Sequence, residues 1–145
     1  MKLISYRGNI DGVNPELENT ISQIENAINN GFDVMIDIFL KDKKLHLGSV
    51  ENSTQLEIDW LEKYHTKLWL NCKDPELLSK FLDLDAIGKH LHYFWFDDKP
   101  TLTSRNYVIS TREHIASRFV IMHPEDGDDI TNVYGICSSN PKKYI

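Results

Sequence analysis

The chain of 145 residues has the length of one ordinary domain, and its 41% hydrophobic and 26% charged residues are typical of a soluble globular fold. The formal net charge of −6 argues against nucleic acid or an anionic membrane as an electrostatic partner. No apolar run approaches the roughly 18 residues of a membrane span, and the first apolar stretch is too short for a signal peptide. We therefore expect a single domain over residues 1–145 that does not enter a membrane.

The two cysteines, Cys72 and Cys137, indicate the compartment. Neither has a second cysteine at the spacing of zinc ligands, so the sequence does not predict a zinc site. Two cysteines in a chain without a recognisable leader favour reduced thiols and a cytoplasmic location.

Hydrophobic periodicity divides the first part of the chain into a strand and a helix. Residues 2–7 alternate apolar and polar side chains and stop at Gly8, which predicts a strand followed by a loop. Asn19 or Thr20 can cap a helix whose apolar residues recur at helical spacing until residues 29–31 end it.

The alternation continues through the middle of the chain. Residues 32–40 are rich in branched and aromatic side chains and predict a second strand, which residues 45–47 extend or pair with. A helix over 54–64, a strand over 68–72 and a helix from Pro75 to about residue 88 follow.

The last third of the chain has little helical pattern. It contains short strand candidates at 92–96, 107–110, 118–122 and 134–137. Alternating strands and helices imply a parallel sheet with helices outside it, but a full (β/α)8 barrel usually needs roughly 200 residues or more. The predicted fold class is therefore α/β, a minimal or incomplete (β/α)8 TIM-type barrel with reduced C-terminal helices.

Short motifs occur at the ends of these elements. They are Tyr6-Arg7-Gly8, Glu18-Asn19-Thr20, Met35-Ile36-Asp37, Ser49-Val50 and Asn71-Cys72-Lys73. In order and spacing they resemble the glycerophosphodiester phosphodiesterase family, within the PLC-like phosphodiesterase superfamily. That family has His-Arg-Gly, Glu-Asn-Thr, Glu-x-Asp, a His-Asp pair and Glu-x-Lys at these places. Residues 94–98, 101–104 and 135–138 also resemble segments of a group of short relatives.

The resemblance implies that most of the catalytic groups have been replaced. In the family, two histidines transfer protons and three carboxylates hold a divalent cation. The two histidine positions fall on Tyr6 and Ser49, and carboxylate positions fall on Met35 and Asn71. A further histidine, found in the short relatives, falls on Phe96. The matching residues that remain are Arg7, Gly8, Glu18, Asp37 and Lys73. We therefore expect no metal and no cofactor.

The leading functional prediction is a catalytically impaired phosphodiesterase-like domain that binds a phosphate-bearing small molecule, or a partner, at the barrel mouth. Its predicted ligand-binding residues are Arg7, Glu18, Asp37, Asn71 and Lys73.

Two alternatives stay open. The first is an active phosphoric diester hydrolase or lyase that uses Mg²⁺ or Ca²⁺, with Tyr6, Arg7, Asp37, Lys73 and one of Asp97 and Asp98 as catalytic residues. The second is a structural protein-interaction module whose mouth is filled by its own side chains. Fold alone does not decide between them.

Several of these residues also have a structural interpretation. Arg7 with Glu18 is either a phosphate clamp or an ion pair that ties the first strand to the loop. For Lys73 with Asp37 the sequence favours a salt bridge. His90 and His92 would share a strand face and are expected at the surface, whereas His123 looks isolated.

Overall fold

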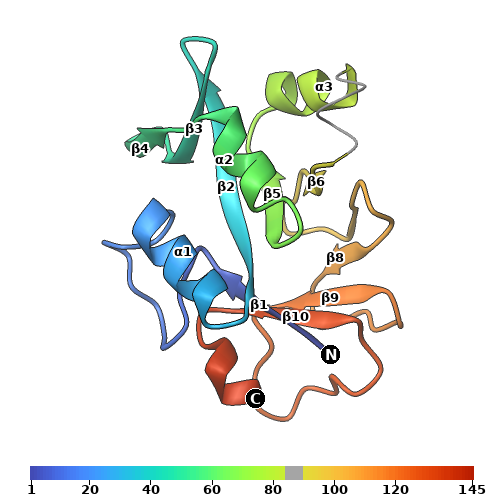
Figure 1. Ribbon diagram of the computed structural model, residues 1–145. Helices are drawn as coiled ribbons and strands as arrows, with labels where there is room; N and C mark the ends of the chain where they lie inside the picture. Colours follow the sequence, from blue (N-terminus) through green and yellow to red (C-terminus); the bar gives the residue numbers. More distant parts are fainter. Residues whose placement is uncertain (84–89) are drawn as a thin grey trace.

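The computed structural model describes residues 1–83 and 90–145. A 10-stranded mixed sheet curls into a half-barrel, and three short helices lie against it (Figure 1). None of the described helices has the length and apolar character needed to cross a membrane.

Strands outnumber helices, and most elements are short. In chain order they are β1 (Lys2–Tyr6), α1 (Ile21–Asn29), β2 (Asp33–Lys41), β3 (Lys44–Ser49), β4 (Asn52–Gln55), α2 (Ile58–Lys63), β5 (Leu68–Cys72), α3 (Pro75–Asp83), β6 (Tyr93–Phe94), β7 (Thr101–Leu102), β8 (Val108–Ser110), β9 (Phe119–Met122), β10 (Gly135–Ser138) and the 3-10 helix η1 (Pro141–Tyr144).

The centre of the sheet is parallel. Its strands run in the order β6-β5-β2-β1-β10-β9-β8, and each neighbouring pair is parallel. β3, β4 and β7 are added antiparallel. Within the described residues no ladder joins β6 to β8, so the curled sheet stays open there. All parallel strands end at the same edge, which brings the residues that follow them together.

The prediction of a (β/α)8 TIM-type barrel is wrong. The structure is a β-rich half-barrel, because its described helices number three and the strands after α3 are joined by loops. The predicted helix over 54–64 begins at Ile58, since residues 52–55 pair with β3 instead. The predicted end of the helix near residue 88 lies outside the described residues.

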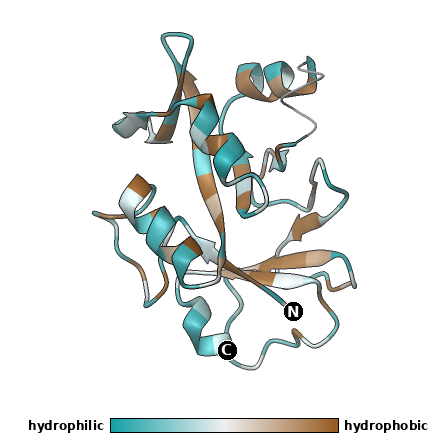
Figure 2. Ribbon diagram, in the orientation of Figure 1, coloured by the Kyte–Doolittle hydropathy of each residue, from teal (hydrophilic) through white to brown (hydrophobic). Residues whose placement is uncertain are grey.

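Hydrophobic residues recur along the strands, as the brown bands in Figure 2 show, and buried apolar side chains form one cluster on each face of the sheet. Because side chains alternate across a strand, Val34 and Ile36 pack outward, against the helices, while Met35 between them points into the half-barrel. The inner cluster comprises Ile4, Met35, Trp69, Phe94, Phe96, Ile109, Val120, Met122 and Cys137. The interior is therefore a packed core, and cavities open at both ends of the strands.

The close approach of β1 and β10 gives a test of the sheet order. A Cβ atom added at Gly135 would lie 2.5 Å from the carbonyl oxygen of Lys2. We expect Gly135→Ala to lower the free energy of unfolding by about 1–3 kcal/mol, measured by urea denaturation. Asn132→Ala, at an exposed position just before β10, should stay within about 0.5 kcal/mol of the parent. Equal stability of the two variants would contradict the β1–β10 pairing.

Candidate functional site

Asp37 organises the carboxyl ends of the strands. Its side chain is 7% exposed and lies near the middle of β2. Oδ2 lies 2.7 Å from Arg7 Nε and accepts a hydrogen bond from Asn19 Nδ2 at 3.2 Å. Oδ1 accepts a hydrogen bond from Asn71 Nδ2 at 3.4 Å. A buried carboxylate needs such partners, so Asp37 joins β1, the loop before α1 and β5.

Two residues with positive φ shape the loop around Asp37. Arg7 has φ 58° and donates its backbone N–H to Met35 O, and Asn19 has φ 56° and donates its backbone N–H to Arg7 O. Asn19 Oδ1 also accepts from the backbone N–H of Asp37 at 3.1 Å. Asparagine tolerates this left-handed conformation. The helix cap is the next residue, Thr20, whose hydroxyl accepts from Gln23 N.

Arg7 is held by two carboxylates. In addition to its contact with Asp37, Nη1 donates to Glu18 Oε1 at 3.3 Å. The contact of Nε with Asp37 is an ion pair without hydrogen-bond alignment. Arg7 is thus a structural link between strand and loop, yet a third of its side chain, 32%, remains exposed. Its Nη2 edge takes no part in these contacts and can meet a ligand.

Tyr6 lies between two nitrogen-bearing groups. Arg7 Cζ is 4.6 Å from the centroid of the Tyr6 ring, and the His123 ring is 4.5 Å away in an edge-on arrangement. Burial raises the pKa of Tyr6 to about 12, although the charge of Arg7 acts in the opposite direction. The phenol therefore stays protonated at neutral pH and can donate a hydrogen bond.

His123 is the site residue that the sequence interpretation missed. It directly follows β9 and has φ 48°. Partial burial against Tyr6 and the charge of Arg7 lower its pKa, so the imidazole is neutral at neutral pH. The available signal was its position at the carboxyl end of a predicted strand, the same criterion that selected Asp37 and Asn71.

These residues surround a cavity of about 340 Å³. Basic and neutral hydrogen-bonding groups contribute to its lining together with two exposed acids. The lining residues are Tyr6, Arg7, Asn71, Lys73, Phe96, Asp97, Asp98, Thr111, Met122 and His123. The predicted residues Tyr6, Arg7, Asn71 and Lys73 are thus brought together, with Asp37 and Glu18 behind Arg7.

Lys73 and Asn71 differ from their predicted roles. Asp37 pairs with Arg7 rather than with Lys73, which is exposed at the cavity. Asn71 uses both ends of its amide within the protein, donating to Asp37 and accepting from Phe96 N at 3.0 Å. Lys73 is therefore available to a ligand, whereas Asn71 has a structural role and links Asp37 to the backbone of Phe96.

Three other residues considered in the sequence do not line this cavity. Ser49 ends β3 and Val50 follows it; both are exposed, and they do not line the cavity. His92, expected at the surface, is 2% exposed and contacts Thr103 Oγ1 through Nε2 at 2.7 Å. Burial, and to a smaller extent the positive charge of Arg105, lowers the pKa of His92 to about 3, so this imidazole is neutral.

The residues around Asp37 do not fit a divalent cation. A hard cation prefers several oxygen ligands with negative charge, whereas both oxygens of Asp37 face the cation of Arg7 or amide donors. Met35, two residues before Asp37 on β2, and Asn71, the residue paired with Asp37 on β5, supply no carboxylate. Within the described part of the chain, no group of three or more His, Cys, Asp or Glu residues is arranged to hold a metal ion.

Comparisons with known protein families, with curated proteins and with solved structures found no match. The resemblance to glycerophosphodiester phosphodiesterases therefore rests on the motifs in the sequence and stays a prediction.

The contacts of Asn19 give a test of the network around Asp37. Asn19→Ala removes two hydrogen bonds and places alanine in the left-handed region, so we expect the free energy of unfolding to fall by about 2–4 kcal/mol. Asn19→Gly relieves the backbone cost and should lose about half as much. Urea denaturation measures both, with Glu16→Ala in the exposed part of the same loop as the control. Parental stability of both Asn19 variants would show that the network is dispensable.

The occupied oxygens of Asp37 lead to a prediction about metals. Isothermal titration calorimetry with MgCl₂ or CaCl₂ should detect no binding tighter than about 1 mM. Asp37→Asn serves as the control, because it keeps the side-chain shape and removes the charge. Micromolar binding to the parent that disappears in this variant would overturn the prediction.

Proposed function

We propose that the chain is a phosphodiesterase-like domain that binds a phosphate-bearing small molecule at the carboxyl ends of its strands without metal-assisted hydrolysis. The observation that carries the proposal is the position of Arg7. Its guanidinium is held by Asp37 through Nε and by Glu18 through Nη1, and among the described residues no partner is found for Nη2; Arg7 lines the cavity, at which Lys73 is also exposed. A planar guanidinium suits phosphate oxygens, and a nearby ammonium adds charge.

The acids of the cavity narrow the kind of ligand. Asp97 and Asp98 are exposed and line the same cavity as the two cations. Carboxylates repel a bare anion but accept hydrogen bonds from hydroxyl or ammonium groups. A phosphate ester of a polyol or an amino alcohol therefore suits the cavity better than inorganic phosphate, with its phosphate at Arg7 and Lys73.

A second candidate function is cleavage of a phosphodiester, and His123 favours it. Its neutral imidazole can accept a proton, and the protonated phenol of Tyr6, 4.5 Å away between ring centroids, can donate one. This pair would take the place of the missing histidines, and its action would need no metal.

The ligand prediction is tested by NMR titration with glycerol 3-phosphate. We expect millimolar binding with shifts at Arg7, Lys73 and their neighbours. Lys73→Gln should weaken binding roughly three- to tenfold, because it removes one charge from an exposed position without disturbing the Asp37 network. Lys142→Gln, which alters an ion pair with Asp11 that does not line this cavity, is the matched control.

Three outcomes separate the alternatives. Absence of shifts at Arg7 and Lys73 would contradict phosphate binding and favour the structural module. Inorganic phosphate binding as tightly as the ester would contradict the role given to Asp97 and Asp98. Turnover of a nitrophenyl phosphodiester that is lost in His123→Gln would establish the second candidate function in place of the first.

A further inference from the structure

A second group of charged and aromatic side chains lies at the opposite end of the sheet, where the parallel strands begin. Asp33, the first residue of β2, is 4% exposed, and its Oδ2 accepts a hydrogen bond from Trp69 Nε1 at 3.0 Å. Lys2 Nζ lies 3.6 Å from Oδ2 and Lys67 Nζ lies 3.7 Å from Oδ1. Both ammonium groups are beyond ordinary hydrogen-bond length and can still bind another anion.

Aromatic rings extend this group from Trp69 towards the last strands. The ring centroid of Tyr134 lies 6.3 Å from that of Trp69 and 4.1 Å from that of Tyr107. Arg118 Cζ lies 4.5 Å from the Tyr107 centroid. Burial, with a contribution from Tyr107, raises the pKa of Tyr134 to about 12, so its hydroxyl remains an uncharged hydrogen-bonding group.

The arginines of this end are not neutralised by acids. Arg105 donates to the carbonyl oxygens of His65 and His90, and Arg118 donates to that of Asn106. Among the described residues, neither guanidinium forms an ion pair with a carboxylate.

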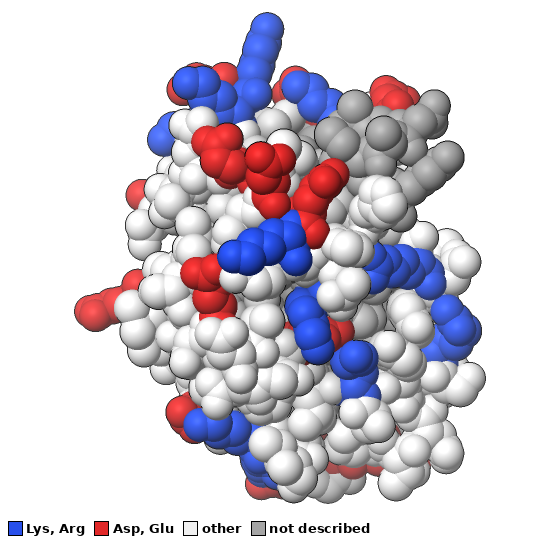
Figure 3. Space-filling view, in the orientation of Figure 1, with Lys and Arg blue, Asp and Glu red and all other residues white. Residues whose placement is uncertain are grey.

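The result is a local excess of positive charge. Asp33 contacts two of the four cations of this group, Lys2 and Lys67, and Arg105 and Arg118 lie at the same end of the sheet. These five side chains carry a summed charge of +3 (4 − 1) in a protein of net charge −6. Figure 3 shows basic side chains gathered on the face where Figure 1 places the N-terminus, β8 and β9. Such a concentration attracts anions to this end of the molecule.

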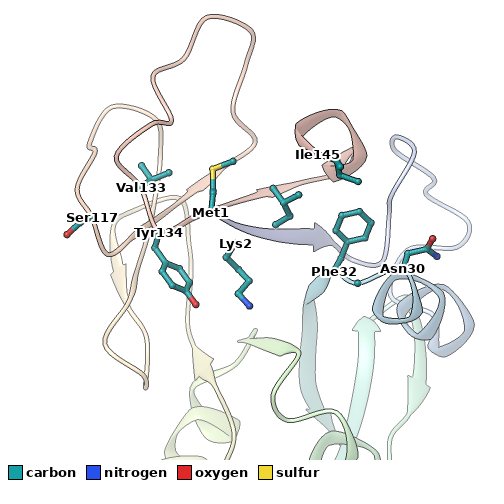
Figure 4. A pocket seen from close by; sticks show the side chains of 10 residues that line it. Met1, Lys2, Asn30, Phe32, Ser117, Val133, Tyr134 and Ile145 are labelled. Atoms are coloured by element: carbon teal, nitrogen blue, oxygen red, sulfur yellow. The ribbon is translucent and has the colours of Figure 1, made fainter.

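A cavity of about 740 Å³ opens beside this group, within the range of small-molecule sites. Lys2, Ser117 and Tyr134 supply polar lining, and Phe32 and Val133 supply apolar lining. In Figure 4, Lys2 extends between Tyr134 and Phe32, and its ammonium lies at the same end as the Tyr134 hydroxyl.

We propose that this amino-end cavity binds a small organic anion, a carboxylate or a phosphate carried on an apolar body. The anionic group lies at the Lys2 ammonium and the Tyr134 hydroxyl, in the field of Lys67 and Arg118. The apolar body packs against Phe32 and Val133. Asp33 holds Lys2 in place but shares its single charge with Lys67, so the pair retains one positive charge for the ligand. The site is separate from the carboxyl-end cavity and does not depend on the function proposed for it.

The indole N–H of Trp69 reports on this site because it is bonded to Asp33, the partner of Lys2. Its ¹H–¹⁵N resonance is identified among the three tryptophans with Trp60→Phe and Trp95→Phe variants. We expect phenyl phosphate and phenylacetate each to shift the Trp69 resonance, with saturation below about 10 mM. Inorganic phosphate carries only the anionic group and benzyl alcohol carries only the apolar body. Each should bind at least roughly fivefold more weakly.

Substitutions of Lys2 and Tyr134 test whether these side chains contact the anionic group of the ligand. Lys2→Gln should weaken phenyl phosphate roughly five- to tenfold and Tyr134→Phe roughly threefold, each measured on the Trp69 resonance. The side chains of Lys142 and Lys73 do not line this cavity, so Lys142→Gln and Lys73→Gln should leave the affinity measured on the Trp69 resonance unchanged.

The proposal is overturned if neither probe shifts Trp69, or if Lys2→Gln and Tyr134→Phe both bind as the parent does. Equal affinity for inorganic phosphate and phenyl phosphate would refute the apolar subsite. Loss of the shift in Lys73→Gln would assign the effect to the carboxyl-end cavity, against the proposal. Should Lys2→Gln fail to fold, the milder Tyr134→Phe, which keeps the aromatic ring, still decides the outcome.

Discussion

The buried carboxylate of Asp37 is the constraint on which the carboxyl end of the sheet depends. A charge in a low-dielectric interior must be paired, and Asp37 takes its partners from β1, the loop before α1 and β5. Satisfying one group therefore fixes the backbone at Arg7 and Asn19, both with positive φ. The same contacts orient the guanidinium that a ligand would meet, so stability and recognition share one network.

The packed interior separates the two ends of the half-barrel. Met35 and Trp69 fill it from adjacent strands, which leaves one cavity where the strands end and another where they begin. Both combine cations with carboxylates, but in different arrangements. At the carboxyl end Asp97 and Asp98 are exposed and can reach a ligand, whereas at the amino end the acid is buried beneath its lysines. The first arrangement suits an ester with polar substituents, and the second suits an anion with an apolar body.

Local patterns in the sequence predicted the early elements well. Apolar spacing and Thr20 located α1, Pro75 marked the start of α3, and the run of apolar residues at 68–72 matched β5. The pairing of strands was predicted wrongly. Residues 52–55 pair with β3 rather than start a helix, and this antiparallel hairpin and the helix-free connections after α3 make the TIM-type barrel wrong. Strand pairing depends on partners far along the chain, which periodicity cannot identify.

For the candidate site, the sequence by itself determined that Arg7, Asp37, Asn71 and Lys73 lie in or directly follow strands, because the alternation of side chains along a strand is a local property. The tertiary structure decided their pairing: Arg7 rather than Lys73 meets Asp37, and His123, far along the chain, lies against Tyr6. It also placed His92 in the interior and gathered the amino-end cations around Asp33. Distance and desolvation set these interactions, and both arise only when remote strands curl into one sheet.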